Sequence, residues 1–491
     1  MIVTGGALLA VVLGHSLAQG SWGLPALASL VFLAALFSHW CNVQLDAWAT
    51  GLLLLGYLIG NRGFAQLTLP NIPLLPGEAV LSVATLLCLW RSAFFKRLPF
   101  RRDAINALIL LWILIGLVRF SQDWTIYRFA AVRDFAFVYY ALFFFFGQAW
   151  AESTPERRWL MGCLTVGMAL SAPVFGLFTW QTDWVVSHLA VGGVPLIYVK
   201  SDVAAGFMVT SLVGSAWKFT RTRRAIWLIA ASAALLGIAY GNSRAAIVAF
   251  GAVCGWLLVL REWRTLRVLF ATLAIGLLLL TAKAAFDGRP WASSQVYRLY
   301  ESIVSTTDLQ GARRYVAELS DKPDNNQFRL VWWRAVIDET TQENPWLGLG
   351  FGRDLAEQFL RTYYGDTNDE FNTRSPHNFL VTIFGRMGLA GLLPVLALLG
   401  AIALKTWRVG RAATRDATSA VDPRLWLGVW AIFTSACFGV VLEGPMGAVV
   451  FWTSLGLANA LANAASADEK SPVTDPHLHA SARADELTSA S

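Results

Sequence analysis

Apolar segments long enough to cross a membrane recur along this chain, and they constrain its fold more than any other feature. A spanning helix needs about 20 mostly apolar residues. Hydrophobic residues make up 56% of the chain and charged residues 14%, whereas soluble domains average about 45–50% and about 25%. No segment shows the alternation over about ten residues that is typical of a transmembrane β-strand. The sequence therefore predicts an all-α fold, a polytopic transmembrane helical bundle.

Twelve to fourteen spans are predicted from these apolar segments. The first three segments are short, so the sequence bounds the number of spans without fixing it. The candidate spans lie near residues 2–18, 22–39, 43–60, 77–95, 104–120, 129–150, 159–180, 202–219, 225–241, 244–260, 267–284, 377–404, 425–442 and 446–464.

Basic residues gather in alternate connections between the predicted spans. Lysine and arginine mark the cytoplasmic loops of membrane proteins, so this pattern predicts that both termini are cytoplasmic and that the connection 284–376 faces outward. The net charge of +7 reflects these loops and does not indicate a nucleic-acid partner. The basic connections are 91–102, 157–158, 218–224, 261–267 and 405–415.

One polar segment, 284–376, interrupts the apolar pattern for 93 residues and carries ten basic and fourteen acidic residues. Asn325 and Asn326 are predicted to cap a helix near 327–343, which Asn344-Pro345 ends because proline cannot continue a helix. Phe328, Val331, Trp332, Ala335 and Val336 give this helix one apolar stripe. The glycine-rich run 346–352 that follows is predicted to be a flexible connection on the membrane surface.

This interruption divides the chain into four predicted regions. Residues 1–283 carry eleven transmembrane helices, and 284–376 form a partly helical periplasmic loop. Residues 377–465 carry three further transmembrane helices, and 466–491 form a polar, disordered cytoplasmic tail.

Three polar side chains are predicted to meet at the outer end of the bundle. Arg244 follows the hairpin 242–243, His377 opens the twelfth span, and Arg329 lies on the loop helix. Arginine holds a diphosphate through two parallel charge-assisted hydrogen bonds. Histidine can take a proton from an attacking hydroxyl. We therefore predict His377, Arg244 and Arg329 as catalytic residues for transfer from a lipid diphosphate to an alcohol.

Neighbouring polar residues allow both structural and functional interpretations. Arg133 is interpreted either as the ion-pair partner of Asp134 or as part of a headgroup groove, and it is predicted with Trp333 to bind substrate. Asp202 and Glu443 are interpreted either as orienting the site or as solvated at the interface, and solvation is favoured. Each of the three catalytic candidates also has a structural alternative on its own: snorkelling for Arg244, a solvated helix face for Arg329, and a helix cap for His377.

Several expected signatures of other functions are missing from the sequence. The chain contains no GxxxxGK[ST] loop, HExxH pair or GxSxG elbow, which argues against an NTP-driven pump or a hydrolase of those kinds. The five cysteines have no paired spacing, so neither a disulfide framework nor a metal site is predicted. His188, in the connection 181–201, is a weaker catalytic candidate than His377. No cofactor is predicted.

Over about residues 200–405 the chain resembles the O-antigen ligase and Wzy-type polymerase family. The resemblance lies in the order and spacing of four motifs. These are Asn-Ser-Arg-Ala-Ala at 242–246, Arg-Leu-Val-Trp-Trp at 329–333, Asn-Pro-Trp-Leu-Gly-Leu-Gly-Phe-Gly at 344–352, and His-Asn-Phe-Leu at 377–380 followed by the glycine-rich 385–393.

The resemblance implies a glycosyltransferase of the bacterial inner (cytoplasmic) membrane that works on the periplasmic face. The donor would be an undecaprenyl diphosphate-linked glycan, and the transfer would be metal-independent and inverting. By motif position, Arg244 and Arg329 would hold the diphosphate and His377 would activate the acceptor.

Three functions remain open at this point. A ligase would use lipid A-core as acceptor, whereas a Wzy-type polymerase would use a growing glycan. A polysaccharide flippase or secondary transporter would need charges near the bilayer midplane and paired broken helices, but the charges here lie mainly at the outer ends of spans.

Overall fold

The computed structural model describes residues 43–68, 75–95, 99–288, 290–308, 321–364, 374–415 and 422–468. The predicted spans at 2–18 and 22–39, and the predicted tail beyond residue 468, lie outside the described residues. Within the described part nearly all secondary structure is helical, as predicted.

The helices follow the predicted spans closely, and each predicted span after residue 42 overlaps a helix. The span predicted at 129–150 is a pair of helices, α6 and α7, that meet at Tyr140-Ala141. In chain order the elements up to the polar segment are α3 (Leu45–Ala65), α4 (Pro76–Phe95), α5 (Ala104–Tyr127), α6 (Phe129–Tyr139), α7 (Leu142–Glu152), α8 (Thr154–Trp180), α9 (Thr182–His188), β1 (Ala190–Val191), β2 (Val194–Pro195), α10 (Ser201–Thr222), α11 (Ala225–Gly241), α12 (Arg244–Val259) and α13 (Trp263–Phe286).

Four helices lie in the described part of the polar segment, and three more follow it. They are η1 (Trp291–Ser293), α14 (Gln295–Thr307), α15 (Asp321–Glu343), α16 (Glu357–Tyr364), α17 (Phe379–Arg415), α18 (Arg424–Ala436) and α19 (Pro445–Asp468). The two short strands form an antiparallel hairpin in which Ala190 pairs with Pro195.

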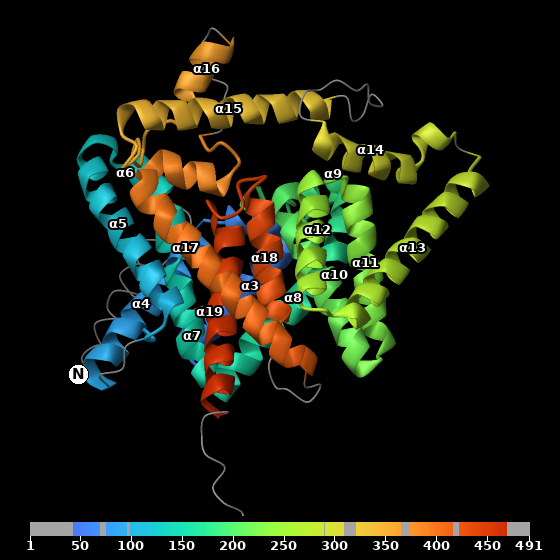
Figure 1. Cartoon of the computed structure of the whole chain (residues 1–491), viewed down its shortest axis with the longest axis horizontal. Helices are drawn as coiled ribbons and strands as arrows, with labels where there is room; N and C mark the ends of the chain where they lie inside the picture. Colours follow the sequence, from blue (N-terminus) through green and yellow to red (C-terminus); the bar gives the residue numbers. More distant parts are fainter. Residues whose placement is uncertain are drawn as a thin grey trace, which may run out of the picture.

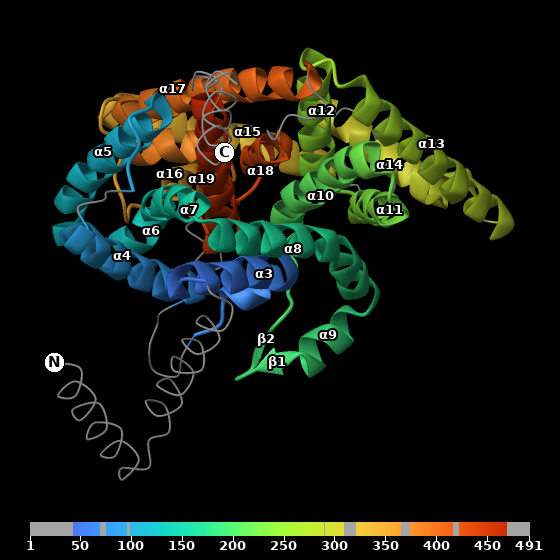
Figure 2. The same ribbon diagram turned by 90° about the horizontal axis from the view of Figure 1, so that it is seen from below.

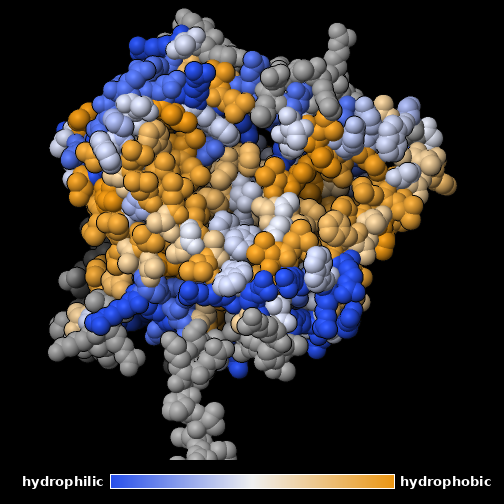
Figure 3. Space-filling view, in the orientation of Figure 1, coloured by the Kyte–Doolittle hydropathy of each residue, from blue (hydrophilic) through white to orange (hydrophobic). Residues whose placement is uncertain are grey.

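The helical bundle has the hydropathy of a multi-pass membrane protein. Figure 3 shows a hydrophobic belt between two hydrophilic rims. By length and composition, six helical stretches in the described part can cross a membrane, and two shorter apolar helices, Ala225–Gly241 and Arg244–Val259, accompany them. The six are Ala104–Tyr127, Phe129–Glu152, Thr154–Trp180, Trp263–Phe286, Phe379–Thr414 and Pro445–Ala464.

Close helix contacts rely on small residues, as expected where packing rather than water exclusion drives association in lipid. Gly456 of α19 lies against α7, and a Cβ there would meet the carbonyl oxygen of Phe144 at 2.2 Å. Aromatic rings fill the space nearby: Trp112 of α5 lies 5.9 Å from both Phe137 and Trp452, between ring centroids. This core fixes α6 and α19, which both contribute to the candidate site.

One end of the bundle is covered by the helices of the polar segment, and we call it the loop side. In Figure 1, α15 lies across this end, roughly at right angles to the bundle helices, with α16 above it and α14 beside it. α13 splays away from the bundle towards α14 in both Figure 1 and Figure 2.

The loop helix α15 differs from the prediction at its start and agrees at its end. It begins at Asp321, so Asn325 and Asn326 lie inside the helix and do not cap it. The Asn326 amide instead donates to the carbonyl oxygens of Ser305 and Asp308. The helix ends at Glu343, before Asn344-Pro345, as predicted.

The predicted apolar stripe of α15 is confirmed. Trp332 and Val336 are buried, and the other stripe residues pack against the same small core, which also contains Phe359 of α16. The rings of Trp332 and Phe359 stack with centroids 5.4 Å apart.

The prediction that the glycine run is flexible is wrong, because residues 348–352 form a tight clamp on the bundle. The Phe351 N–H donates to Asp123 Oδ2 of α5 (2.7 Å), and the Gly352 N–H donates to Asp134 Oδ2 of α6 (2.8 Å). The Leu349 N–H donates to the Gly385 carbonyl of α17 (2.7 Å). We call residues 348–352 the glycine clamp.

The glycines of this clamp serve close approach with a left-handed backbone. Gly350 and Gly352 both have φ of +96°, which L side chains rarely adopt. A Cβ on Gly352 would lie 2.2 Å from Cβ of Tyr127, and a Cβ on Gly350 would lie 2.6 Å from the Asp123 carboxylate. Glycine is therefore used here to dock the loop rather than to loosen it.

The span predicted at 425–442 is wrong in its second part. α18 ends at Ala436, and 437–444 form an irregular segment. The helix stops because the Val440 N–H donates to Asp202 Oδ2 (3.0 Å) and Gly439 packs directly on that carboxylate. Irregular backbone at membrane depth is tolerated where it is buried in protein or lines a cavity, and this segment lines the cavity described next.

Candidate functional site

A polar cavity of about 380 Å³ lies on the loop side of the bundle. Segments far apart in the sequence build it: the end of α3, α6, the residues before α10, the residues before α17, α17 itself, the irregular segment 437–444 and the start of α19. The lining residues are Arg62, Arg133, Asp134, Phe137, Lys200, Arg374, Ser375, His377, Thr382, Arg386, Val440, Glu443 and Met446.

Cations outnumber anions in this lining, five to two. Asp134 is engaged by two of them, Arg386 at 2.8 Å and Arg374 at 3.4 Å. The predicted pair of Arg133 with Asp134 is therefore wrong, since Arg374, before α17, and Arg386 of α17 pair with that carboxylate. Lys200 lines the cavity and pairs, at 3.2 Å, with Asp202, a residue outside the lining.

Arg133 has no hydrogen-bond or ion-pair partner among the residues that the structure describes, although it lines the cavity. An arginine is charged at any biological pH and has five N–H donors. The cavity therefore holds a cationic group that is free to bind an anion.

His377 reaches the cavity from a strained backbone. Its φ is +56°, in the left-handed region that non-glycine residues seldom occupy, and such strain often accompanies function. Trp333 of α15 holds this turn, because its indole N–H donates to the Pro376 carbonyl oxygen at 2.6 Å. The Trp332 ring packs edge-on against the imidazole, with centroids 5.8 Å apart.

The electrostatic surroundings keep His377 neutral. Its partial burial lowers the pKa most, and the positive charges of Arg329 and Lys200 lower it further, to about 4. The imidazole is then uncharged at neutral pH and can accept a hydrogen bond from a hydroxyl.

Arg329 lies beside this site, one turn before Trp333 on α15. Its Nη1 donates to the Phe438 carbonyl oxygen at 2.9 Å, which ties α15 to the irregular segment. Its charge acts on His377, so the structure brings together Arg329 and His377 as the sequence predicts.

Arg244 takes a different position on the same side of the bundle. Its guanidinium donates to Asn326 of α15, and it is not among the residues that line the cavity. Asn326 and Arg329 are three residues apart, so they are neighbours on one face of the helix. α15 therefore connects Arg244 to the surroundings of His377.

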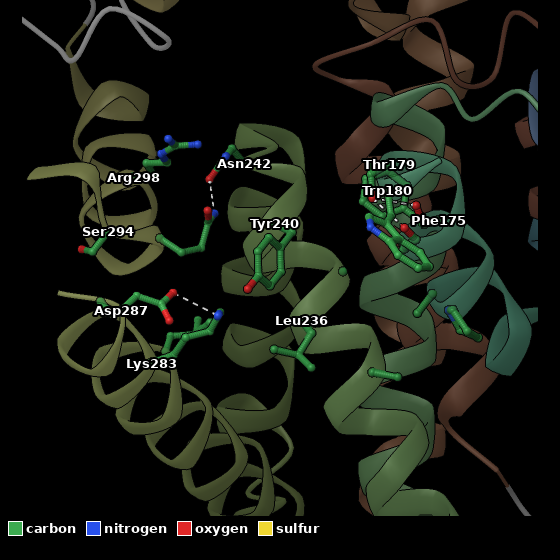
Figure 4. A pocket seen from close by; sticks show the side chains of 18 of the residues that line it. Phe175, Thr179, Trp180, Leu236, Tyr240, Asn242, Lys283, Asp287, Ser294 and Arg298 are labelled. Atoms are coloured by element: carbon green, nitrogen blue, oxygen red, sulfur yellow. Dashed lines mark hydrogen bonds and ion pairs between the residues drawn. The ribbon is translucent and has the colours of Figure 1, made fainter. Parts of the chain in front are cut away.

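A second cavity, of about 690 Å³, lies between α8, α11, α13 and α14 (Figure 4). Its charged groups pair with each other, as Lys283 Nζ lies 3.0 Å from Asp287 Oδ2. Gln295 donates to Asn242, in the hairpin that precedes Arg244 (3.1 Å). No histidine from the described ranges lines this cavity, so the His377 cavity is the stronger candidate for chemistry.

Glu443 lines the cavity, although the sequence analysis favoured solvation at the interface over a role in the site. Its Oε1 accepts hydrogen bonds from the Ser375 hydroxyl (3.0 Å) and the Thr382 hydroxyl (3.1 Å). Its Oε2 is buried and has no hydrogen-bond partner in the part of the chain that the structure describes. Burial raises the pKa of this carboxyl to about 7, so the predicted solvation at the interface is wrong.

A signal for Glu443 was present in the sequence. Gly444 and Pro445 follow it within an apolar stretch, and this pair favours a break in the helix. Asp202 is likewise not solvated as predicted, because its carboxylate accepts from the Val440 N–H. The weaker candidate His188 is exposed and stacks on Trp184 with ring centroids 5.3 Å apart, away from the cavity lining.

Comparison with known families adds an independent observation. Residues 229–396 match the family described as O-antigen ligase. Arg244, Arg329 and His377 all lie within the matched residues, whereas Arg133 and Glu443 lie outside them. No curated protein matches the chain closely enough to be reported as a relative. Residues 229–396 of this multi-pass membrane protein are thus similar to the O-antigen ligase family, as the motifs predict.

Proposed function

We propose that the protein transfers a glycan from undecaprenyl diphosphate to a sugar hydroxyl of lipid A-core, at the periplasmic face of the bacterial inner membrane. The observation that supports this most directly is the cavity in which a neutral histidine shares one polar lining with Arg133, an arginine that no described residue pairs with. In this proposal the loop side is periplasmic and both termini are cytoplasmic.

The reaction needs stabilisation of a leaving diphosphate. The acceptor oxygen forms a bond to the anomeric carbon, and the bond from that carbon to the diphosphate oxygen breaks. The diphosphate leaves with the electron pair, so negative charge grows on it. Arg133 in the cavity and Arg329 beside it are proposed to offset this charge, and preorganised donors of this kind contribute on the order of 3 kcal/mol each.

His377 is proposed to act on the acceptor side. Because its imidazole is neutral, it can accept a hydrogen bond from the acceptor hydroxyl and aim the oxygen at the anomeric carbon. Trp333 is proposed to support this geometry through its bond to Pro376. Arg244, at the other end of the α15 contact, is proposed to hold the donor diphosphate before transfer, as its motif position implies.

A reconstituted transfer assay tests the function. Purified protein would be mixed with an undecaprenyl diphosphate-linked glycan and lipid A-core, and the products separated by size and lipid anchor. We expect glycan attached to lipid A-core, without added metal or cofactor, and no product with His377→Ala or Arg329→Ala.

The same assay separates the other functions. Longer lipid-linked glycans, formed without any glycan on lipid A-core, would identify a polymerase. Movement of intact donor across proteoliposomes, with neither product formed, would indicate a transporter and contradict the proposal.

A further inference from the structure

The carboxylate of Glu443 has a geometry that its structural contacts do not explain. Both hydroxyl donors, Ser375 and Thr382, bind the same oxygen, Oε1. The other oxygen, Oε2, is buried without a hydrogen-bond partner in the described residues. A buried acceptor without a partner costs about 1–3 kcal/mol, so its presence in a polar cavity calls for a ligand that donates to it.

We propose that Glu443 is the group that removes the proton from the acceptor hydroxyl during glycan transfer. This inference rests on the proposed function and adds a catalytic residue to it. His377 then orients the hydroxyl, and Glu443 Oε2 receives the proton.

The proton balance of this step is complete. As the acceptor oxygen bonds to the anomeric carbon, its proton moves to Oε2 and the diphosphate departs with the electron pair of the broken bond. Glu443 returns to the carboxylate when it passes the proton to water or to the released diphosphate. The Ser375 and Thr382 hydroxyls keep the other oxygen fixed throughout.

The basicities of Glu443 and His377 agree with Glu443 as the proton acceptor and His377 as the group that orients the hydroxyl. General-base catalysis is most efficient when the pKa of the base lies near the working pH. The pKa of Glu443 is raised to about 7 by burial, whereas that of His377 is lowered to about 4. The imidazole is therefore the weaker base of the two at neutral pH.

Charged groups around Glu443 come from most of the elements that build the cavity; α19 contributes only Met446. Burial raises the pKa of the Glu443 carboxyl, and Lys200, before α10, lowers it by a smaller amount. Burial and then the charge of Glu443 raise the pKa of the Cys437 thiol, on the same irregular segment. The remaining titratable or charged groups in the lining are Arg62 of α3, Arg133 and Asp134 of α6, Arg374 and His377 before α17, and Arg386 of α17.

The test compares two isosteric substitutions in the full-length protein. Glu443→Gln keeps an oxygen for Ser375 and Thr382 but cannot take a proton. We expect kcat for transfer to fall about 10²- to 10⁴-fold, while the melting temperature and donor affinity stay unchanged. Glu156→Gln is the matched control, since Glu156 is also a buried glutamate but is not among the residues lining this cavity; its kcat should stay at the wild-type value.

The pH profile separates a proton acceptor from a structural carboxylate. Glu443 accepts a proton only when ionised, so wild-type kcat should rise tenfold per pH unit below about 7 and level off above it. In Glu443→Gln this rise should disappear. A variant that keeps more than a tenth of wild-type kcat, or that keeps the rise, overturns the inference. A wild-type protein without any transfer instead refutes the proposed function itself.

Discussion

Arg133 differs from Lys200, Arg374 and Arg386, which each pair with a carboxylate, because no described residue pairs with it. If it holds the donor, Arg133→Ala should raise the KM for the lipid diphosphate about 10- to 100-fold, since one hydrogen bond to a charged group contributes about 1.5–3 kcal/mol. Arg133→Lys should recover only part, because lysine lacks the planar fork. Steady-state kinetics with a purified donor would measure both.

Arg334→Ala is the control for Arg133, since the Arg334 side chain is 84% exposed on α15, where it pairs with Asp338. Its KM should match the wild type. If Arg133→Ala also has the wild-type KM, then Arg133 does not bind the donor.

Substitution of Arg244 tests whether this residue takes part in transfer. We expect Arg244→Ala to abolish transfer in cells while the protein is made at the normal level, because the fork that would hold the diphosphate is lost. Glycan attached to lipid A-core can be followed on gels alongside an immunoblot of the protein. Near-normal transfer would remove Arg244 from the site.

At the residue level, sequence reasoning found polar groups that stand near helix ends but not their partners. His377 and Arg329 lie near enough for the charge of Arg329 to lower the pKa of His377. Solvation was favoured for Glu443 because a single acidic residue between apolar segments looks the same whether it is solvated or buried. Its partners, Ser375 and Thr382, are more than 60 positions away in the chain.

At the level of elements, substitution in the glycine clamp is expected to change protein stability most directly. Gly352→Ala combines an unfavourable φ, about 1–2 kcal/mol, with overpacking against Tyr127, about 1–3 kcal/mol. It should therefore lower the melting temperature of the detergent-solubilised protein and reduce transfer. Differential scanning fluorimetry would measure the first effect.

Gly192→Ala is the matched control for the clamp. Gly192 has a φ of +58° but nothing within 4 Å of its added Cβ, so it carries only the backbone cost. Equal melting temperatures for the two variants would show that close packing of the clamp does not stabilise the protein.

Element boundaries were predictable where local signals decide them. α15 ends just before Asn344-Pro345, as predicted, because proline blocks a helix whatever surrounds it. The start of α15, the docked glycine clamp and the end of α18 were not predictable, since each involves residues distant in the chain. These are the carbonyl groups of Ser305 and Asp308 for the first, the carboxylates of Asp123 and Asp134 for the second, and that of Asp202 for the third.

For the whole molecule, the distribution of basic loops predicts the orientation in the membrane. In a variant without native cysteines, Thr341→Cys on exposed α15 should react with a membrane-impermeant maleimide in intact spheroplasts. Arg223→Cys, in the connection after α10 on the opposite side, should react only after permeabilisation. The reverse labelling pattern would place the loop side in the cytoplasm and exclude a periplasmic site.

The overall architecture followed from the sequence because hydropathy and helix length are local properties. The cavity did not, because seven separate segments create it, and apolar patterning cannot tell which helix ends adjoin.

The attachment of α15 at both ends affects how substrates would reach the cavity beneath it. One end is tied through Asn326 to Arg244 and the α14 end, and the other runs into the glycine clamp on α5 and α6. Because α15 is attached at both ends, it cannot swing away from the bundle. We therefore expect bulky sugar chains to enter and leave along the sides of α15, with both reactants arriving laterally from the lipid bilayer.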